Sequence, residues 1–374
     1  MRIAINTRFL LPHKMEGFGW FTYEVVKRIV QQHPEHEFFF FFDRKFDSKF
    51  IFSDNVTPIV LHPQARHPIL FKIWFNYSVT KALKKHNIDL FFSPDGYLSL
   101  KTNVKQIGVI HDLNFEHYPE DLPKSPRNYL TKYFQKFANK ANKIITVSEF
   151  SKQDIVEQYN IEPNKIEVAR NGGNEDFKPL KVLEKNEIKK QFTVGENYFV
   201  YVGALHARKN TTRLFEAFNQ FKKMSNSDLK LLIVGEKLWK SGDSNTFFNQ
   251  LEFKDDIIFT GHLKIDLLTK IVGSAMGLVL VSYFEGFGIP LVEAMRCGTP
   301  IITSNQTALP EVAGDCGLLV NPFDVNEIAN AMYTLESDKK LQIELSKKGL
   351  ERSKLFSWDK SASIIWTEIE NLLT

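Results

Sequence analysis

Short apolar runs of strand length alternate with amphipathic helical patterns along most of the chain. This alternation is typical of parallel sheets whose faces are covered by helices. The sequence therefore predicts an α/β fold. The strands expected in the first half are 2–6, 37–42, 58–61, 90–92, 106–110 and 143–147, with helices such as 21–31 and 69–86 between them.

A second series of apolar runs follows residues 170–179, a segment that is rich in glycine and polar turn formers. A chain of 374 residues is long for a single core and suits two domains. We therefore expect a domain boundary near residue 175. The strands expected beyond it are 198–202, 231–234, 257–260, 277–281, 300–303 and 317–320.

The composition is that of an ordinary globular protein, with 43% hydrophobic and 25% charged residues. Residues 1–175 hold 24 Lys and Arg against 19 Asp and Glu, a balance of +5, whereas the remainder holds 24 against 25. An excess of this size is compatible with an anionic acceptor or a lipid surface. It is too small to indicate a nucleic-acid partner.

Three features of the sequence bear on where the protein works. No secretory leader is visible ahead of the first expected strand, and the most apolar uncharged stretch, 271–284, is too short to cross a bilayer. The two cysteines, Cys297 and Cys316, form no Cys-x-x-Cys pattern, which favours a reducing compartment. We therefore expect a cytoplasmic protein that is at most peripheral to a membrane.

The most informative motif is a glycine turn between two acidic residues, Glu285 and Glu293. It follows an apolar strand, and Pro290 suits the first helical position after the turn, with Glu293 expected in the first helical turn. Such a helix start directs backbone N–H groups at an anion, while the two carboxylates suit hydroxyl groups. The turn itself, which we expect to approach the ligand, consists of Gly286, Phe287, Gly288 and Ile289.

A second motif begins at Gly203, at the end of an expected strand, and reaches Arg208 and Lys209 just before a helix. Cations oppose the dipole at a helix N-terminus. They are favourable there if an anion is shared between them and the helix start. A solvated pair of loop cations is the alternative for this motif taken alone.

Two patterns in the first half are weaker. His111 ends an expected strand, where open α/β sheets bind ligands, although a structural histidine is the alternative. Gly17 and Gly19, in the segment Glu16-Gly17-Phe18-Gly19-Trp20, lie between the first strand and the first expected helix. The chain contains no complete dinucleotide fingerprint, no Asp-x-Asp, no zinc-like Cys/His spacing and no Gly-x-Ser-x-Gly turn.

The order of the two C-terminal motifs, Gly-x-x-x-x-Arg-Lys-Asn and then Glu-Gly-Phe-Gly with a second glutamate, resembles retaining family-4 glycosyltransferases of GT-B fold. Bacterial mannosyltransferases of polysaccharide assembly are the most similar members. The resemblance implies two Rossmann-like domains facing each other across a cleft. It assigns residues 1–175 and a returning helix at about 357–374 to an acceptor-side domain, and 176–356 to a nucleotide-sugar domain.

The resemblance also implies roles for the motif residues. Arg208, Lys209 and the amides near Gly288 stabilise the leaving diphosphate, Glu285 holds hydroxyls of the transferred sugar, and Glu293 holds the ribose. With His111, which is assigned to the sugar and phosphate region, Arg208, Lys209 and Glu285 form the expected catalytic set. The expected donor-binding set is Gly17, Gly19, Gly203, Arg208, Lys209, Leu263, Glu285, Gly286, Phe287, Gly288, Ile289 and Glu293.

Neither a cofactor nor a metal is expected, because cations and helix ends can neutralise a diphosphate. The resemblance favours GDP-mannose over a UDP-sugar as donor, and a glycan or lipid-linked glycan as acceptor. A nucleotide-sugar epimerase and a non-catalytic sugar-nucleotide-binding module are the alternatives. The basic and aromatic stretch 124–143 is either a membrane-surface helix or a plain amphipathic surface helix.

Overall fold

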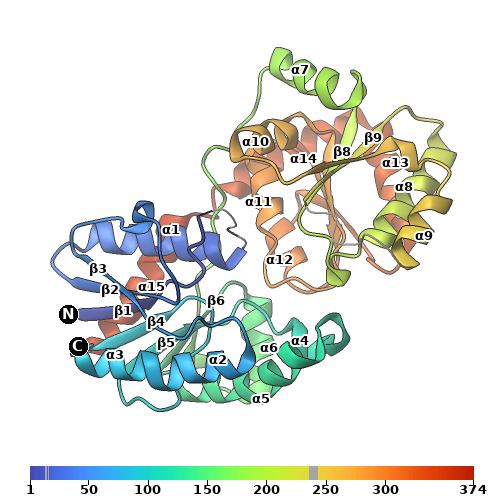
Figure 1. Ribbon diagram of the computed structural model, residues 1–374. Coiled ribbons are helices and arrows are strands. Elements are labelled where there is room, and N and C mark those ends of the chain that lie inside the picture. The colour runs from blue at the N-terminus through green and yellow to red at the C-terminus, as the bar shows by residue number, and fades with distance from the viewer. Residues whose placement is uncertain (13–14, 16, 236–242) are drawn as a thin grey trace. The chain divides into compact units, whose positions relative to one another are not determined.

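The computed structural model describes residues 1–12, 15, 17–235 and 243–374. The chain forms two compact units, and each is described here by itself (Figure 1). Unit 1 consists of Met1–Asn171 and Ser357–Thr374, and unit 2 of Gly172–Phe356. The chain thus passes from unit 1 to unit 2 at residues 171–172, whereas the sequence pattern places the boundary near 175.

Unit 1 contains a seven-stranded parallel sheet with the order β3-β2-β1-β4-β5-β6-β7. The strand order changes direction between β1 and β4, so the carboxyl ends of these strands are where an open sheet of this type binds ligands. The strands are β1 (Arg2–Asn6), β2 (Glu37–Phe42), β3 (Val56–Val60), β4 (Leu90–Ser93), β5 (Lys105–Val109), β6 (Lys143–Thr146) and β7 (Ile166–Val168).

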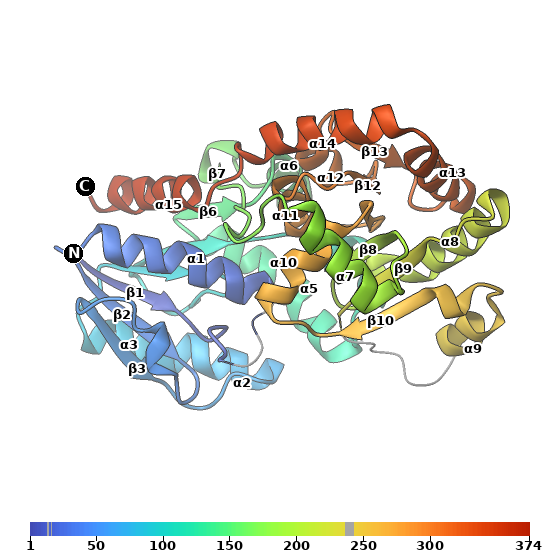
Figure 2. The same ribbon diagram turned by 90° about the horizontal axis from the view of Figure 1, so that it is seen from above.

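Helices cover both faces of this sheet (Figures 1 and 2). Phe39 and Phe41 of β2 pack on one face with Trp74 and Phe75, whereas Phe38 faces Trp366 on the other, with ring centroids 6.3 Å apart. The strand is therefore buried on both faces, as its unbroken apolar run predicts. The helices are α1 (Gly17–Gln32), α2 (Pro68–Ile73), α3 (Thr80–Lys85), α4 (Asn114–His117), α5 (Lys124–Lys140), α6 (Glu149–Tyr159) and α15 (Trp358–Leu373), with the π-helix η2 (Trp74–Val79) and the 3₁₀ turns η1 (Ser48–Phe50), η3 (Pro119–Asp121) and η4 (Pro163–Lys165).

The last helix, α15, is an integral part of unit 1. It packs beside α1, where Asp359 accepts a hydrogen bond of 2.8 Å from Nε of Arg28. Further along, Glu368 pairs with Lys143 at 2.9 Å, and Trp366 stacks on the ring of His33. Apolar packing and ion pairs thus bind this helix to residues far earlier in the chain.

Unit 2 contains a six-stranded parallel sheet with the order β10-β9-β8-β11-β12-β13. Its strand order changes direction between β8 and β11. The strands are β8 (Tyr198–Val202), β9 (Lys230–Val234), β10 (Ile257–Gly261), β11 (Gly277–Leu280), β12 (Ile301–Ser304) and β13 (Gly317–Val320).

The helices of unit 2 connect these strands in the α/β manner that the alternating pattern predicts. The helices are α7 (Val182–Thr193), α8 (Thr211–Ser225), α9 (Asp243–Gln250), α10 (Ile265–Ser274), α11 (Ile289–Arg296), α12 (Leu309–Ala313), α13 (Val325–Ser337) and α14 (Lys339–Ser353), with the 3₁₀ turns η5 (Ala207–Lys209) and η6 (Lys254–Asp256).

Both cysteines, Cys297 and Cys316, are buried free thiols. Among the described residues of the whole chain, no helix is long and apolar enough to cross a membrane.

Candidate functional site

The two strongest motifs of the sequence meet at the carboxyl ends of β8 and β11, the central strands of unit 2. Gly203 follows β8 directly, and Glu285 lies in the loop that follows β11. The two loops are joined by the backbone, since the N–H of Tyr283 donates to the carbonyl of Arg208 at 3.0 Å. The fold therefore places both motifs at the sheet's change of direction, where ligands of such sheets bind.

Glu285 is the centre of a charged cluster. Nη1 of Arg208 donates to its Oε2 at 2.7 Å, and Nζ of Lys209 donates to its Oε1 at 2.5 Å. The hydroxyl of Ser282 donates to the same Oε1 at 2.7 Å. Burial alone would raise the pKa of this 5%-exposed residue, but Arg208 and Lys209 outweigh burial and lower the pKa to about 2. Glu285 is therefore a permanently ionised anchor for two cations.

The glycine turn leads directly into α11. Gly288 caps the helix with φ of 97°, and a Cβ atom there would lie 2.7 Å from Cδ2 of Leu309. No side chain of the described residues caps this helix. Pro290 has no N–H, and the N–H of Leu291 donates to the carbonyl of Gly288 at 3.0 Å. Ile289 is therefore the residue of the first three whose amide can meet an anion. The side chain of Phe287 is buried against Phe356, so this residue can offer a ligand only its backbone.

Glu293 contrasts with Glu285, although both flank the same turn. It is the fifth residue of α11, beyond the first helical turn, which corrects the expectation from sequence. Among the described residues no hydrogen bond to its carboxylate is found. Burial raises the pKa of Glu293 to about 8, and Arg296 opposes this only in part. A ligand that donates hydroxyl hydrogen bonds would satisfy this carboxylate.

Glycines line the neighbouring strand ends of unit 2. A Cβ atom on Gly235 would lie 2.1 Å from the carbonyl oxygen of Gly203, so the chain passes too closely here for a side chain. The N–H of Gly235 donates to the carbonyl of Gly261 at 3.0 Å. Leu263, a half-buried residue, lies between β10 and α10 beyond this contact. These residues lie along the carboxyl ends of β8, β9 and β10, on the side of β8 that is opposite β11 and Glu285.

His111 lies at the corresponding edge of unit 1, after β5. Its Nε2 is 2.8 Å from the carbonyl oxygen of Pro94, and because a carbonyl can only accept, Nε2 carries the proton. Burial lowers the pKa of His111, which favours the neutral ring with Nδ1 as an acceptor. Phe18 and Phe21 contact the ring edge-to-face, each with a centroid distance of 4.8 Å.

Gly17 and Gly19 belong to α1 and not to a loop before it, which corrects the expected helix start at residue 21. A Cβ atom on Gly19 would lie 2.8 Å from the carbonyl oxygen of Phe9, whereas one on Gly17 would meet nothing within 4 Å. Glycine is therefore required at position 19 for close approach to the segment that follows β1. Glu16 of the same motif lies outside the described residues.

Sequence reasoning missed a buried ion pair in unit 1. Nε of Arg8 donates to Asp95 at 2.6 Å, and both side chains are almost fully buried. The rings of Phe9 and Tyr97 lie 4.7 and 4.5 Å from the guanidinium carbon. Both residues follow central strands, β1 and β4, and this position at two strand ends is the signal that could have identified them.

The expected site residues thus fall into two groups, one in each unit. Unit 2 brings Arg208, Lys209 and Glu285 into direct contact, followed by the turn and Glu293. In unit 1, His111 contacts Phe18. Phe18 lies between the two glycines at the start of α1. Among the described residues, no group of three or more His, Cys, Asp or Glu side chains is arranged to hold a metal ion.

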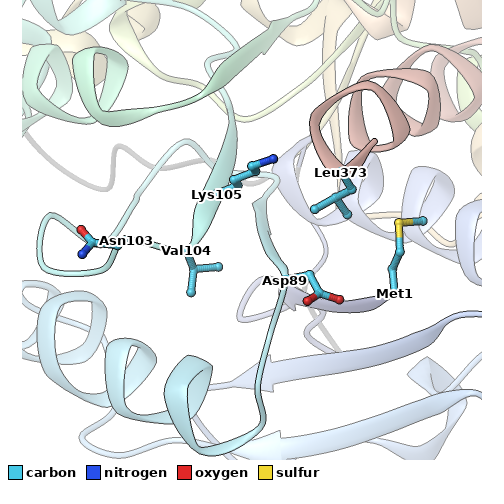
Figure 3. Close-up of a pocket in the computed structure, with 6 residues that line it drawn as sticks. All are labelled: Met1, Asp89, Asn103, Val104, Lys105 and Leu373. Carbon is cyan, nitrogen blue, oxygen red and sulfur yellow. The ribbon is translucent and has the colours of Figure 1, made fainter.

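A cavity of about 510 Å³ in unit 1 lies elsewhere (Figure 3). Apart from Leu373 at the end of α15, its lining residues precede or begin β1, β4 and β5, so it is at the amino ends of these strands. Ligands of parallel sheets bind at the carboxyl ends, and the cavity is therefore separate from the candidate site. It is lined by Met1, Asp89, Asn103, Val104, Lys105 and Leu373.

The comparisons with known proteins identify two family domains along the chain. The family described as Glycosyltransferase Family 4 matches residues 15–177, and Glycosyl transferases group 1 matches residues 184–352. O-antigen chain mannosyltransferase B of Escherichia coli is 26% identical over 361 residues, which cover 93% of this chain and 94% of that protein. O-antigen chain mannosyltransferase RfbU of Salmonella typhimurium is 29% identical over 269 residues, which cover 71% and 70%.

A solved structure shows the same fold. Anabaena HepE in complex with UDP-glucose superposes with a TM-score of 0.78 at 17% identity, covering 99% of this chain and 100% of that chain. The two consecutive family matches account for most of the chain, and each lies mainly in one Rossmann-like unit. The chain therefore belongs to the glycosyltransferases of GT-B fold, with a family 4 domain followed by a group 1 domain.

Proposed function

We propose that this glycosyltransferase moves a sugar from a nucleoside-diphosphate sugar to a hydroxyl of a glycan or lipid-linked glycan, with retention of the anomeric configuration. The observation that carries the proposal is the cluster of Arg208 and Lys209 around Glu285. The side chains of Arg208 and Lys209 are 27% and 14% exposed, so both cations are accessible to a departing diphosphate. The amides at the start of α11 add a second source of positive potential.

The two carboxylates have different parts in this proposal. Glu285 fixes the cations and holds hydroxyls of the transferred sugar. Glu293, whose raised pKa reflects burial, accepts hydrogen bonds from the ribose hydroxyls of the nucleotide. Both assignments extend the roles that the family resemblance implies.

The proposal also gives residues of unit 1 the roles that the family resemblance implies. Neutral His111 accepts a hydrogen bond from a sugar hydroxyl through Nδ1, since its Nε2–H is committed to the carbonyl of Pro94. The amides at Gly17 and Gly19 approach the diphosphate. Leu263 and its neighbours after β10 meet the nucleobase.

No protein nucleophile is assigned. A carboxylate with a pKa of about 2 is a weak base, and both oxygens of Glu285 already accept hydrogen bonds. We therefore infer a front-face substitution in which the leaving phosphate takes the proton of the acceptor hydroxyl. Retention would be tested by NMR of the product's anomeric proton, and an inverted product would contradict this mechanism.

The names of the relatives support a proposal for the biological setting and for the class of donor. Both O-antigen proteins are named as chain mannosyltransferases, which favours GDP-mannose and a role in surface polysaccharide assembly. The HepE structure holds UDP-glucose, so a UDP-sugar is the competing donor.

A panel of GDP- and UDP-sugars, read by mass spectrometry, tests the proposed function. Slow hydrolysis of one donor without an acceptor, and transfer when a glycan acceptor is added, are the expected results. Interconversion of two sugar nucleotides would instead indicate an epimerase. Binding without either reaction would indicate a non-catalytic module.

A further inference from the structure

One helical surface of unit 1 combines positive charge with exposed apolar side chains. The helices α2, η2 and α3 form one continuous run, and α5 contacts α2 beside it (Figure 1). Both bury aromatic side chains against the same face of the sheet, for example Trp74 from the run and Phe137 from α5. Their remaining sides therefore form a joint outer surface, which we call the basic helical face.

The chain is free of acidic residues throughout both parts of this face. Residues 55–88 and 122–148 contain no Asp or Glu. The nearest acids in the sequence are Asp54, Asp89, Asp121 and Glu149, at the ends of these segments. The modest excess of positive charge in the first half is therefore concentrated here. The exposed cations are Arg66, Lys72, Lys81, Lys84, Lys85, Lys124, Lys132 and Lys136.

The apolar part of the face comes from α2 and η2. Ile69, Ile73 and Tyr77, which follow each other at intervals of one helical turn, are 65%, 37% and 55% exposed. Nζ of Lys101 lies 5.3 Å from the ring centroid of Tyr77 and adds another cation beside it. By contrast, the aromatic side chains of α5 at positions 129, 134 and 137 are buried. The helix that the sequence singled out thus supplies charge, while its neighbour supplies the exposed apolar side chains.

We propose that the basic helical face binds the surface of an anionic lipid bilayer, with Ile69, Ile73 and Tyr77 entering the headgroup region. An apolar stripe bordered by lysines on a helix is the pattern of interfacial membrane helices. Lysine and tyrosine side chains can extend their polar ends to lipid phosphates while their apolar parts stay buried. The positive charge of the face complements anionic headgroups.

The test uses the full chain and vesicles of phosphatidylcholine with or without phosphatidylglycerol. We expect co-sedimentation with the anionic vesicles only, weakened by salt. Replacing Ile69, Ile73 and Tyr77 together by Ser should lower the partition coefficient at least tenfold, without changing hydrolysis of the donor. The matched control is Val182→Ser with Leu183→Ser in unit 2, two side chains of comparable exposure that should be dispensable.

The charge is tested separately by Lys84→Glu with Lys85→Glu, with Lys339→Glu and Lys340→Glu as the control pair. A loss confined to the first pair supports the proposal. Equal binding to neutral vesicles, unchanged binding of the triple variant, or equal losses in the controls would overturn it. Sedimentation velocity identifies the competing occupant: a dimer abolished by the triple variant, with no binding to vesicles, would assign the face to a second copy.

Discussion

Each unit places a buried carboxylate against cations at the same point of its sheet, the carboxyl ends of the two strands where the order changes direction. In unit 1, Asp95 pairs with Arg8, and the two side chains are only 2% and 4% exposed. In unit 2, Glu285 pairs with Arg208 and Lys209, whose side chains are 27% and 14% exposed. The two clusters share a position but differ in charge and access.

The difference separates a structural ion pair from the proposed ligand site. One cation and one carboxylate under aromatic rings are mutually satisfied, so Arg8 and Asp95 hold the loops after β1 and β4 in place. In unit 2 the side chains of Arg208 and Lys209 are partly accessible, so they can meet an anionic ligand at the sheet edge. The two clusters thus occupy the same position in their sheets, and the accessibility of the cations distinguishes them.

The largest expected effect breaks the structural pair. Asp95→Ala leaves the Arg8 guanidinium buried without its carboxylate, which should lower the free energy of unfolding by about 3–5 kcal/mol. Urea unfolding followed by circular dichroism measures this loss, and Lys340→Ala on an exposed helix is the control. A loss below about 1 kcal/mol would mean that water or other groups replace Asp95 easily.

The next effect concerns rate. Lys209→Ala should remove about 2–4 kcal/mol of transition-state stabilisation, a fall of roughly 30- to 1,000-fold in kcat/KM, if Lys209 neutralises the diphosphate. Its stability should change far less than that of Asp95→Ala, because Arg208 still pairs with Glu285. Near-normal turnover in Lys209→Ala, assayed by release of nucleoside diphosphate, would refute the assigned role.

The third prediction distinguishes the roles of Glu285 and Glu293 by measuring the binding of two parts of the donor, inorganic diphosphate and the free nucleoside. The family resemblance assigns Glu285 to the transferred sugar alone, but its contact with Lys209 also predicts weaker binding of the diphosphate when Glu285 is changed. Glu285→Gln should weaken inorganic diphosphate, whereas Glu293→Gln should weaken the free nucleoside. Each loss should be about 1.5–3 kcal/mol, or at least tenfold. Calorimetry of both variants with both fragments decides, and a reversed pattern would exchange the roles.

A smaller effect is the pH dependence that Glu293 introduces. Because its pKa is raised to about 8 from an ordinary value near 4.5, the folded state retains a proton that the unfolded state loses. Stability should therefore fall as pH rises from about 5 to 8. Ribose hydroxyls favour the ionised form, so binding of nucleoside diphosphate at pH 7 should release a proton.

Calorimetry in buffers of different ionisation enthalpy measures that proton release. Glu293→Gln should abolish it and should flatten the pH dependence of stability. Release that persists unchanged in the variant would assign the proton to another group. Glu285, whose pKa is about 2, stays ionised over this range and provides the internal contrast.

The smallest expected effect is that of a chelator. If the cation cluster and the start of α11 take the place of a metal, transfer should continue in excess EDTA at an unchanged rate. Loss of activity that magnesium or manganese restores would show that the cluster alone cannot neutralise the diphosphate.

Much of the fold follows from local pattern. The unbroken apolar runs predicted the central strands of both sheets because strands buried on both faces need no polar alternation. The short strand β7 was missed, since its three residues give too little pattern. Gly17 and Gly19 suggested a loop because glycine disfavours helices. The close approach of Gly19 to Phe9 is a tertiary requirement that overrides this preference.

The site was predictable in part for the same reason. The glycine turn and its helix are local, so Glu285, Gly288 and Glu293 could be identified from spacing. The contact of Lys209 with Glu285 joins residues 76 positions apart, and that of Arg8 with Asp95 joins residues 87 apart. No local pattern reports such pairs, and only the strand order brings them together.

The return of α15 to unit 1 has a consequence for synthesis on the ribosome. Unit 2 is one uninterrupted stretch of chain, whereas unit 1 lacks the partner of α1 until residues 357–374 emerge. Since domains fold as units during translation, the second unit can finish folding before the first. Until then the surface around His33 and Phe38, later covered by Trp366, is open to chaperones and to aggregation. A stop codon shortly before Trp358 would therefore damage the unit that is made first.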